Sequence, residues 1–235
     1  MQVCAAPPFA ADHALSCDAR WQAHDLLRLH RLPQSDGEPA WVRGAFERAP
    51  YAVVRRALAA DGFVAIGLRG VERSQRYGTW VHLDDIETAV APEALAHRAP
   101  LAGRNALPAF AALAALQRDA VGGDTAGVLA GFVWGPTGST GFELATQAPT
   151  VTLSSDLDLL IRAPEKLSHD TAIQLLNQLQ TIAQRAGIRV DAQLETPAGG
   201  VALAEWAAGK ARAMARHARG PQLVTDPWAP AHVDA

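Results

Sequence analysis

Residues 154–161 read Ser154-Ser155-Asp156-Leu157-Asp158-Leu159-Leu160-Ile161, and this stretch decides how the second half of the chain folds. Its apolar run over 158–161 predicts a short buried strand. Residues two apart in a strand face the same side, with Cα atoms about 6.6 Å apart. Asp156 and Asp158 therefore present two carboxylates to one face, while Leu157 and Leu159 pack on the other. Two hard oxygen ligands this close suit Mg²⁺, which proteins hold with one or two carboxylates plus substrate phosphates.

A second carboxylate-bearing segment follows at residues 189–195, which read Arg189-Val190-Asp191-Ala192-Gln193-Leu194-Glu195. Strand alternation puts Asp191, Gln193 and Glu195 on one face and the apolar residues on the other. If this strand lies beside the strand of Asp158, Asp191 completes a three-carboxylate site. Bridging carboxylates of this kind hold two metal ions about 3.5–4 Å apart.

The segments around these two strands predict the rest of the second half. Residues 122–141 contain seven glycines and are expected to be largely loop. Ser168 is a good N-cap and Gly187 a good stop signal for a helix between them. Residues 188–194 are expected to form a strand, 197–200 a break and 201–216 a final helix. This alternation of helices and strands indicates an α/β or α+β fold.

The chain is expected to divide into a loose tail over 1–19, an N-terminal domain over 20–95 and a catalytic domain over 96–235. Two β-prone runs, 51–55 and 63–68, flank the turn sequence Asp61-Gly62 and predict a hairpin. Apolar residues at 107, 110, 113 and 116 have helical spacing. That helix would begin the catalytic domain, and the N-terminal domain is expected to be a smaller α+β domain.

Composition excludes several classes of protein. The 235 residues are 49% hydrophobic and 19% charged, which is typical of a globular protein. The net charge of −3 provides no basic field for nucleic acid or for an anionic membrane. The longest strongly apolar uncharged run, 106–116, is too short to span a bilayer. The two cysteines, Cys4 and Cys17, form no disulfide framework or metal-ligand pattern, which fits a reducing cytoplasm.

Taken together, Gly138-Ser139, the later Ser155-Asp156-Leu157-Asp158 and the third carboxylate Asp191 resemble the signature of the DNA polymerase β-like nucleotidyltransferase superfamily. The resemblance implies that the Gly-Ser pair opens a helix and that the later aspartates lie on neighbouring strands. It departs from the superfamily in one respect, because sixteen residues separate Ser139 from Asp156, which is longer than usual.

Longer motifs resemble one family more closely. They are residues 134–146 (WGPTGSTGFELAT), 155–160 (SDLDLL), 191–206 (DAQLETPAGGVALAEW), 24–27 (HDLL) and 69–76 (RGVERSQR). These are similar to the malonate decarboxylase holo-acyl-carrier-protein synthases, the phosphoribosyl-dephospho-CoA transferases of the MdcG family. The resemblance implies transfer of the phosphoribosyl-dephospho-CoA group from 2′-(5″-triphosphoribosyl)-3′-dephospho-CoA to a serine of the apo acyl carrier protein, with release of pyrophosphate.

The resemblance and the residues together suggest roles at the site. Asp156, Asp158 and Asp191 are expected to be catalytic and to hold Mg²⁺ or Mn²⁺. Gly138 and Ser139 are expected to offer backbone N–H groups to the leaving phosphates at a helix N-terminus. Ser155, Gln193 and Glu195 are expected to be hydrogen-bonding neighbours rather than ligands.

An arginine-rich stretch in the N-terminal domain suggests a second contact surface. Residues 43–76 contain seven arginines against three acidic residues. Arg69, Arg73 and Arg76 are candidates for binding the triphosphate, because guanidinium groups bind phosphate oxygens in pairs. The same basic face would also suit an acidic carrier protein, although a charged face is often simply solvated.

Three other functions stay open on the sequence. One is a related nucleotidyltransferase that acts on a citrate-lyase-type carrier protein or on a small molecule, since a fold does not determine its substrate. Another is a catalytically inactive module that binds a carrier protein, which the intact aspartates disfavour. The third is nucleic-acid binding, which the net charge of −3 disfavours.

Overall fold

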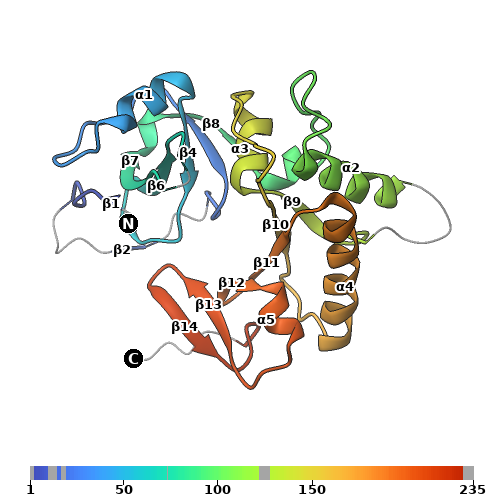
Figure 1. Ribbon diagram of the computed structural model, residues 1–235. Helices are drawn as coiled ribbons and strands as arrows, with labels where there is room; N and C mark the ends of the chain where they lie inside the picture. The colour runs from blue at the N-terminus through green and yellow to red at the C-terminus, as the bar shows by residue number, and fades with distance from the viewer. Residues whose placement is uncertain (1–2, 10–14, 17–19, 73, 122–127, 230–235) are drawn as a thin grey trace. The chain divides into compact units, whose positions relative to one another are not determined.

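The computed structural model describes residues 3–9, 15–16, 20–72, 74–121 and 128–229 (Figure 1). The chain divides into two compact units, Met1–Ala91 and Pro92–Ala235. The boundary expected from the sequence follows residue 95, four residues beyond Ala91. Both units combine helices with largely antiparallel sheets, so the fold belongs to the α+β class. In the described residues, no helix has the length and apolar character needed to cross a membrane.

The N-terminal unit is built on a six-stranded sheet in the order β1-β7-β6-β4-β3-β8. A two-stranded sheet of β2 and β5 and the helices α1 and η1 complete the unit. The elements are β1 (Val3–Cys4), β2 (Leu15–Ser16), β3 (Leu26–Leu29), α1 (Trp41–Arg48), β4 (Tyr51–Val54), β5 (Ala59–Ala60), β6 (Phe63–Arg69), β7 (Arg76–His82), η1 (Leu83–Asp85) and β8 (Ile86–Val90).

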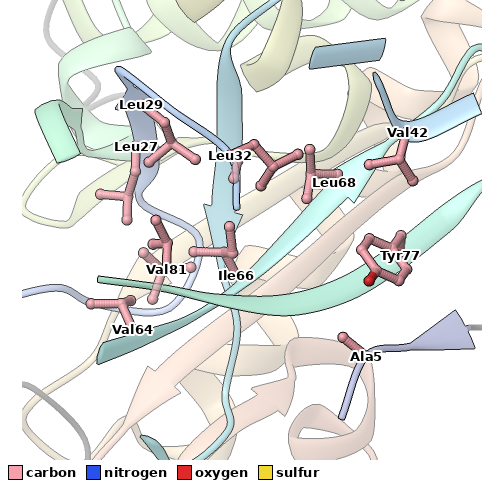
Figure 2. Packing of buried hydrophobic residues seen from close by; sticks show 12 residues of the cluster. Ala5, Leu27, Leu29, Leu32, Val42, Val64, Ile66, Leu68, Tyr77 and Val81 are labelled. Carbon is pink, nitrogen blue, oxygen red and sulfur yellow. The ribbon is translucent and has the colours of Figure 1, made fainter. Parts of the chain in front are cut away.

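One apolar cluster holds this sheet together. Figure 2 shows Leu27 of β3, Ile66 of β6 and Val81 of β7 among its members, and all three are fully buried. Val42 of α1 belongs to the same cluster, so the helix covers this side of the sheet. Burying a side chain of this size contributes about 1.5–3 kcal/mol, so the cluster is the main source of the unit's stability.

The predicted pairing of residues 51–55 with 63–68 is confirmed. β4 and β6 are antiparallel neighbours, with Val53 opposite Gly67. The connection is longer than a tight hairpin, because β5 intervenes before the turn at Asp61-Gly62. Gly62 has a φ of +81°, which explains the glycine at that turn.

The C-terminal unit contains a second six-stranded sheet in the order β14-β13-β12-β11-β10-β9. β10 and β11 are parallel, and the other neighbours are antiparallel. The elements are η2 (Pro92–Leu95), α2 (Pro108–Val121), β9 (Val133–Pro136), α3 (Gly138–Thr146), β10 (Leu157–Arg162), α4 (His169–Ala186), β11 (Val190–Thr196), β12 (Gly199–Ala202), α5 (Leu203–Ala207), β13 (Ala213–His217) and β14 (Gly220–Val224).

Helix α4 makes the parallel pairing of β10 and β11 possible, because parallel strands need a crossover connection. Its predicted ends are confirmed. The Ser168 side chain accepts a hydrogen bond from Thr171 N at 3.1 Å, and Gly187 closes the helix with a φ of +67°. Leu175, Leu179 and other apolar residues at helical spacing are buried along one face, which packs α4 onto the unit.

The helix predicted near the end of the chain is largely wrong. The helix expected over 201–216 is only α5, which stops before Gly209 at a φ of +62°. Residues 213–217 form β13, and Gly220–Val224 pairs with it as β14. Buried Ala213 and Ala215 alternate with less buried neighbours, so sheet pairing overrides the high helix propensity of alanine.

Candidate active site

The register of the parallel strands brings two of the predicted carboxylates together. Asp158 of β10 lies directly opposite Asp191 of β11. Neighbouring strands are about 4.8 Å apart, and residues in register face the same side of a sheet. Leu157 and Leu159, between and after the aspartates, are buried on the opposite face as predicted. Asp156 immediately precedes β10 and is two residues from Asp158, so its side chain is near the same edge.

The start of helix α3 lies against Asp158. Thr137 N donates a hydrogen bond to the Asp158 carbonyl oxygen at 2.8 Å, and the helix begins at the next residue, Gly138. Gly138 has a φ of +59°, and a Cβ at this position would overlap Oδ2 of Asp158. Only glycine meets both demands. The expected helix opening at Gly138-Ser139 is therefore present, with its positive end beside a carboxylate.

Arg189, which the sequence did not single out, joins the other two aspartates. Its Nη2 donates to Oδ2 of Asp156 at 3.0 Å and to Oδ2 of Asp191 at 2.8 Å. The arginine and Asp191 are mostly exposed, with 67% and 54% of their side-chain surfaces accessible. One guanidinium therefore balances part of the negative charge of the three aspartates.

A second ion pair, also missed from the sequence, fixes helix α3. Glu143 is fully buried, and its carboxylate accepts two hydrogen bonds from Arg104. Arg104 Nε donates to Oε1, and Arg104 Nη2 donates to Oε2 at 2.9 Å. Backbone N–H groups of Thr150 and Val151 donate to Oε2 at 2.7 and 2.8 Å. The loop between α3 and Asp156 is thus fastened to α3, which accounts for the long gap between Ser139 and Asp156. The only hint in the sequence is an acidic residue between Phe142 and Leu144.

The environment of Glu143 keeps it ionised. Burial by itself would raise the pKa of the carboxyl, but hydrogen bonds from Arg104 and from the two backbone N–H groups lower it below its usual value. The hydrogen bond between the two side chains raises the pKa of Arg104 above its usual value. A buried charge with all these partners is a fixed structural element.

The expected neighbours of the aspartates have partners of their own. Ser155 Oγ accepts from Thr152 N at 2.9 Å, so it closes the turn before β10. Gln193 Oε1 accepts from Arg216 Nη1 at 3.1 Å. Glu195 lies opposite Arg162 in the strand register, four residues along β11 from Asp191.

The three candidate arginines belong to the N-terminal unit. Arg69 ends β6, Arg76 begins β7, and the two face each other across the antiparallel ladder. Arg69 is half-buried and Arg76 is exposed. Arg73 is outside the described residues. Their role in binding the triphosphate stays a prediction.

The donor atoms of the aspartates fit a hard divalent cation, because all are carboxylate oxygens. The absence of a Cβ at Gly138 leaves the space that Oδ2 of Asp158 fills. In the part of the chain that the structure describes, however, no three His, Cys, Asp or Glu side chains are arranged to hold a metal. Asp156 and Asp191 both direct Oδ2 to the guanidinium of Arg189. Two carboxylates plus substrate phosphates would suffice for Mg²⁺.

Family models cover almost the whole length of the chain. The model of the phosphoribosyl-dephospho-CoA transferase MdcG N-terminal domain matches residues 22–92, and that of the MdcG C-terminal domain matches residues 94–227. The chain belongs to the MdcG family of phosphoribosyl-dephospho-CoA transferases. The resemblance seen in the sequence motifs is thereby confirmed, and the protein is a transferase.

Individual MdcG relatives match over most of their length. A phosphoribosyl-dephospho-CoA transferase of Pseudomonas aeruginosa is 42% identical over 216 residues, which cover 91% of this chain and 97% of the relative. The transferase of Azotobacter vinelandii is 39% identical over 88% of this chain and 94% of its own. That of Klebsiella pneumoniae is 36% identical over 87% and 95%. No solved structure matches the chain.

Proposed function

We propose that this MdcG-family enzyme transfers the phosphoribosyl-dephospho-CoA group from 2′-(5″-triphosphoribosyl)-3′-dephospho-CoA to a serine of the malonate decarboxylase apo acyl carrier protein. The observation that carries the proposal is the register of Asp158 with Asp191 beside the Gly138 end of α3. This arrangement combines paired carboxylates with a helix N-terminus, as polymerase β-like nucleotidyl transfer requires. We assign the C-terminal unit to that fold on the same grounds.

The proposed reaction breaks a phosphoanhydride bond of the donor and forms a phosphoester bond to the serine. The serine hydroxyl oxygen attacks the α-phosphorus of the triphosphate, the bond from that phosphorus to the bridging oxygen breaks, and pyrophosphate leaves. Asp191 takes the hydroxyl proton, for which its exposure suits it. The backbone N–H groups at Gly138 and Ser139 bind the departing phosphates at the positive end of α3. Catalysis of this kind is mostly positioning and charge neutralisation.

Asp156, Asp158 and Asp191 are the residues that would hold Mg²⁺ or Mn²⁺. A bound divalent cation would neutralise the triphosphate and lower the pKa of the attacking hydroxyl. Through that cation, the aspartates would hold the reacting phosphate near the N-terminus of helix α3. We also propose that Arg69, Arg73 and Arg76 contact the triphosphate or the carrier protein.

The decisive experiment is a mass measurement on apo carrier protein incubated with the enzyme, the triphosphate donor and Mg²⁺. We expect the carrier to gain the mass of the phosphoribosyl-dephospho-CoA group, and pyrophosphate to appear in equal amount. Excess chelator should abolish both, and Mg²⁺ or Mn²⁺ should restore them. A Ser→Ala carrier protein is the matched control and should gain no mass.

Two results would contradict parts of the proposal. Modification of a citrate-lyase-type carrier, but not of the malonate decarboxylase carrier, would change the acceptor while leaving the chemistry intact. Full turnover in excess chelator would exclude metal assistance.

A further inference from the structure

Arg189 occupies a central place among the aspartates. It directly precedes β11, and its carbonyl oxygen accepts a hydrogen bond from Leu157 N at 3.0 Å, which ties its backbone to β10. Its side chain bonds to Asp156 and Asp191 through the single nitrogen Nη2. The backbone of Arg189 is therefore fixed at the two strands that carry the aspartates, while its side chain ends on their carboxylates.

These two bonds can be exchanged at little cost. The Arg189 side chain is 67% exposed and that of Asp191 is 54% exposed, while that of Asp156 is 22% exposed. Ion pairs of an exposed guanidinium contribute little to stability because water and salt screen them. The carboxylates held in this way are two of the three that would bind the divalent cation. A cation of charge +2 arriving with a triphosphate would compete effectively for them.

The guanidinium of Arg189 has further N–H groups that can donate hydrogen bonds. A guanidinium carries five N–H donors, and in the described part of the chain the hydrogen bonds of the Arg189 side chain all involve Nη2. Once Nη2 leaves the aspartates, it forms a planar fork with either Nε or Nη1, the geometry that binds phosphate oxygens in pairs. A side chain released from the aspartates would carry this fork at the edge of the site.

We propose that Arg189 is a triphosphate-binding residue that holds Asp156 and Asp191 in the donor-free enzyme and moves to the phosphate oxygens when the donor binds. The inference rests on the proposed function, since it takes the aspartates as the cation ligands. Its ligand is a polyphosphate ester together with a divalent cation. One consequence is that the enzyme binds the cation weakly until a triphosphate is present.

The test uses full-length protein and two separate binding measurements. Mn²⁺ binding is followed by the electron paramagnetic resonance of the free ion, without and with inorganic triphosphate, and binding of Mg²⁺-triphosphate is followed by calorimetry. Arg189→Ala should bind Mn²⁺ alone at least about fivefold more tightly than the wild type, because a competitor is gone. It should bind Mg²⁺-triphosphate at least about tenfold more weakly, the usual size of a lost charge-assisted hydrogen bond.

Two further variants keep the result interpretable. Arg185→Ala removes an exposed arginine from the last turn of α4 and should leave both affinities unchanged. Arg189→Gln keeps a polar side chain without the charge and should behave like Arg189→Ala, so it replaces that variant if the latter folds poorly.

Equal Mn²⁺ affinity in wild type and Arg189→Ala, or equal affinity for Mg²⁺-triphosphate, would overturn the role proposed for Arg189. It would leave the proposed function of the enzyme intact. Absence of Mn²⁺ binding in every protein, even with triphosphate, would overturn that role together with the metal-assisted mechanism.

Discussion

Two of the arginine–carboxylate sets in the C-terminal unit differ in almost every physical respect. Glu143 is fully buried, takes two hydrogen bonds from Arg104 and two more from the backbone, and has a lowered pKa. Asp156 and Asp191 share one nitrogen of the exposed Arg189 at the ends of two strands, with 22% and 54% of their side-chain surfaces accessible. The Glu143 carboxylate has all its hydrogen-bond partners within the protein, whereas the Arg189 and Asp191 side chains are accessible to a ligand.

The difference shows that an arginine–carboxylate contact can have either a fully buried or a solvent-accessible setting around the same helix. Helix α3 carries Gly138 at its start, beside Asp158, and Glu143 five residues later. The buried pair holds the helix and the following loop in place. We expect the set at the strand ends to be the place where a ligand replaces Arg189. Neutralising a carboxylate should therefore affect catalysis in one set and stability in the other.

The largest effect is expected from Asp158→Asn. Asparagine keeps the size of the side chain but lacks the charge that would hold a cation, so transfer should fall by at least about 10³-fold with little change in stability. Asp156→Asn and Asp191→Asn should resemble it. Single-turnover assays on apo carrier protein, with thermal melts in parallel, measure both properties.

Glu195→Gln is the control for these three variants, since Glu195 is expected to be outside the metal site. It should retain most activity. An active Asp158→Asn would contradict the mechanism. A dead Glu195→Gln beside an active Asp191→Asn would mean that the third carboxylate is Glu195.

Glu143→Gln should act on stability first. The change leaves Arg104 without its buried countercharge, which we expect to lower the free energy of unfolding by about 3 kcal/mol. Urea titration followed by circular dichroism measures the loss. The control is Asp226→Asn, which breaks an exposed pair with Lys166 and should cost less than about 1 kcal/mol. Equal losses in the two variants would refute the distinction between the buried and the exposed sets.

Gly138→Ala tests the contact between α3 and Asp158. Alanine adds a Cβ where Oδ2 of Asp158 lies, so the carboxylate must move, and transfer should fall by about 10²-fold. The left-handed backbone alone should cost about 1 kcal/mol of stability.

Gly131→Ala is the control that separates the backbone strain of Gly138→Ala from its contact with Asp158. Gly131 also has a positive φ, of +84°, but an added Cβ would meet nothing within 4 Å. It should lose similar stability and keep its activity. If both variants lose activity equally in the transfer assay, the contact with Asp158 has no special role.

The smallest effect is a pH dependence of the buried pair. The pKa of Glu143 is lower in the folded protein than in the unfolded chain, so its stabilising contribution is complete above about pH 4.3, the ordinary value for glutamate. The contribution is lost as the pH falls through the folded-state pKa. The difference in unfolding free energy between wild type and Glu143→Gln should therefore shrink from pH 7 to pH 3. A constant difference in urea titrations across this range would contradict the assignment.

Local signals were enough for several elements of the fold. Ser168 and Gly187 mark the ends of α4 because capping depends on neighbouring backbone groups alone. The alternation around Asp158 predicts β10 and its buried face, since strand geometry has a period of two. Local signals failed at residues 201–216, where alanine-rich sequence favours a helix but pairing of β13 with β14 prevails.

The sequence by itself determined the family, the strand that carries Asp158 just after Asp156, and the glycine at the start of α3, because each depends on adjacent residues or on a contiguous motif. Only the tertiary structure decided which groups meet across the chain. Asp158 faces Asp191 because α4 brings two strands into parallel register, and Arg104 reaches Glu143 from 39 residues away. Arg189 bridges Asp156 and Asp191 for the same reason. Such pairings depend on long-range packing, which no periodicity in the sequence encodes.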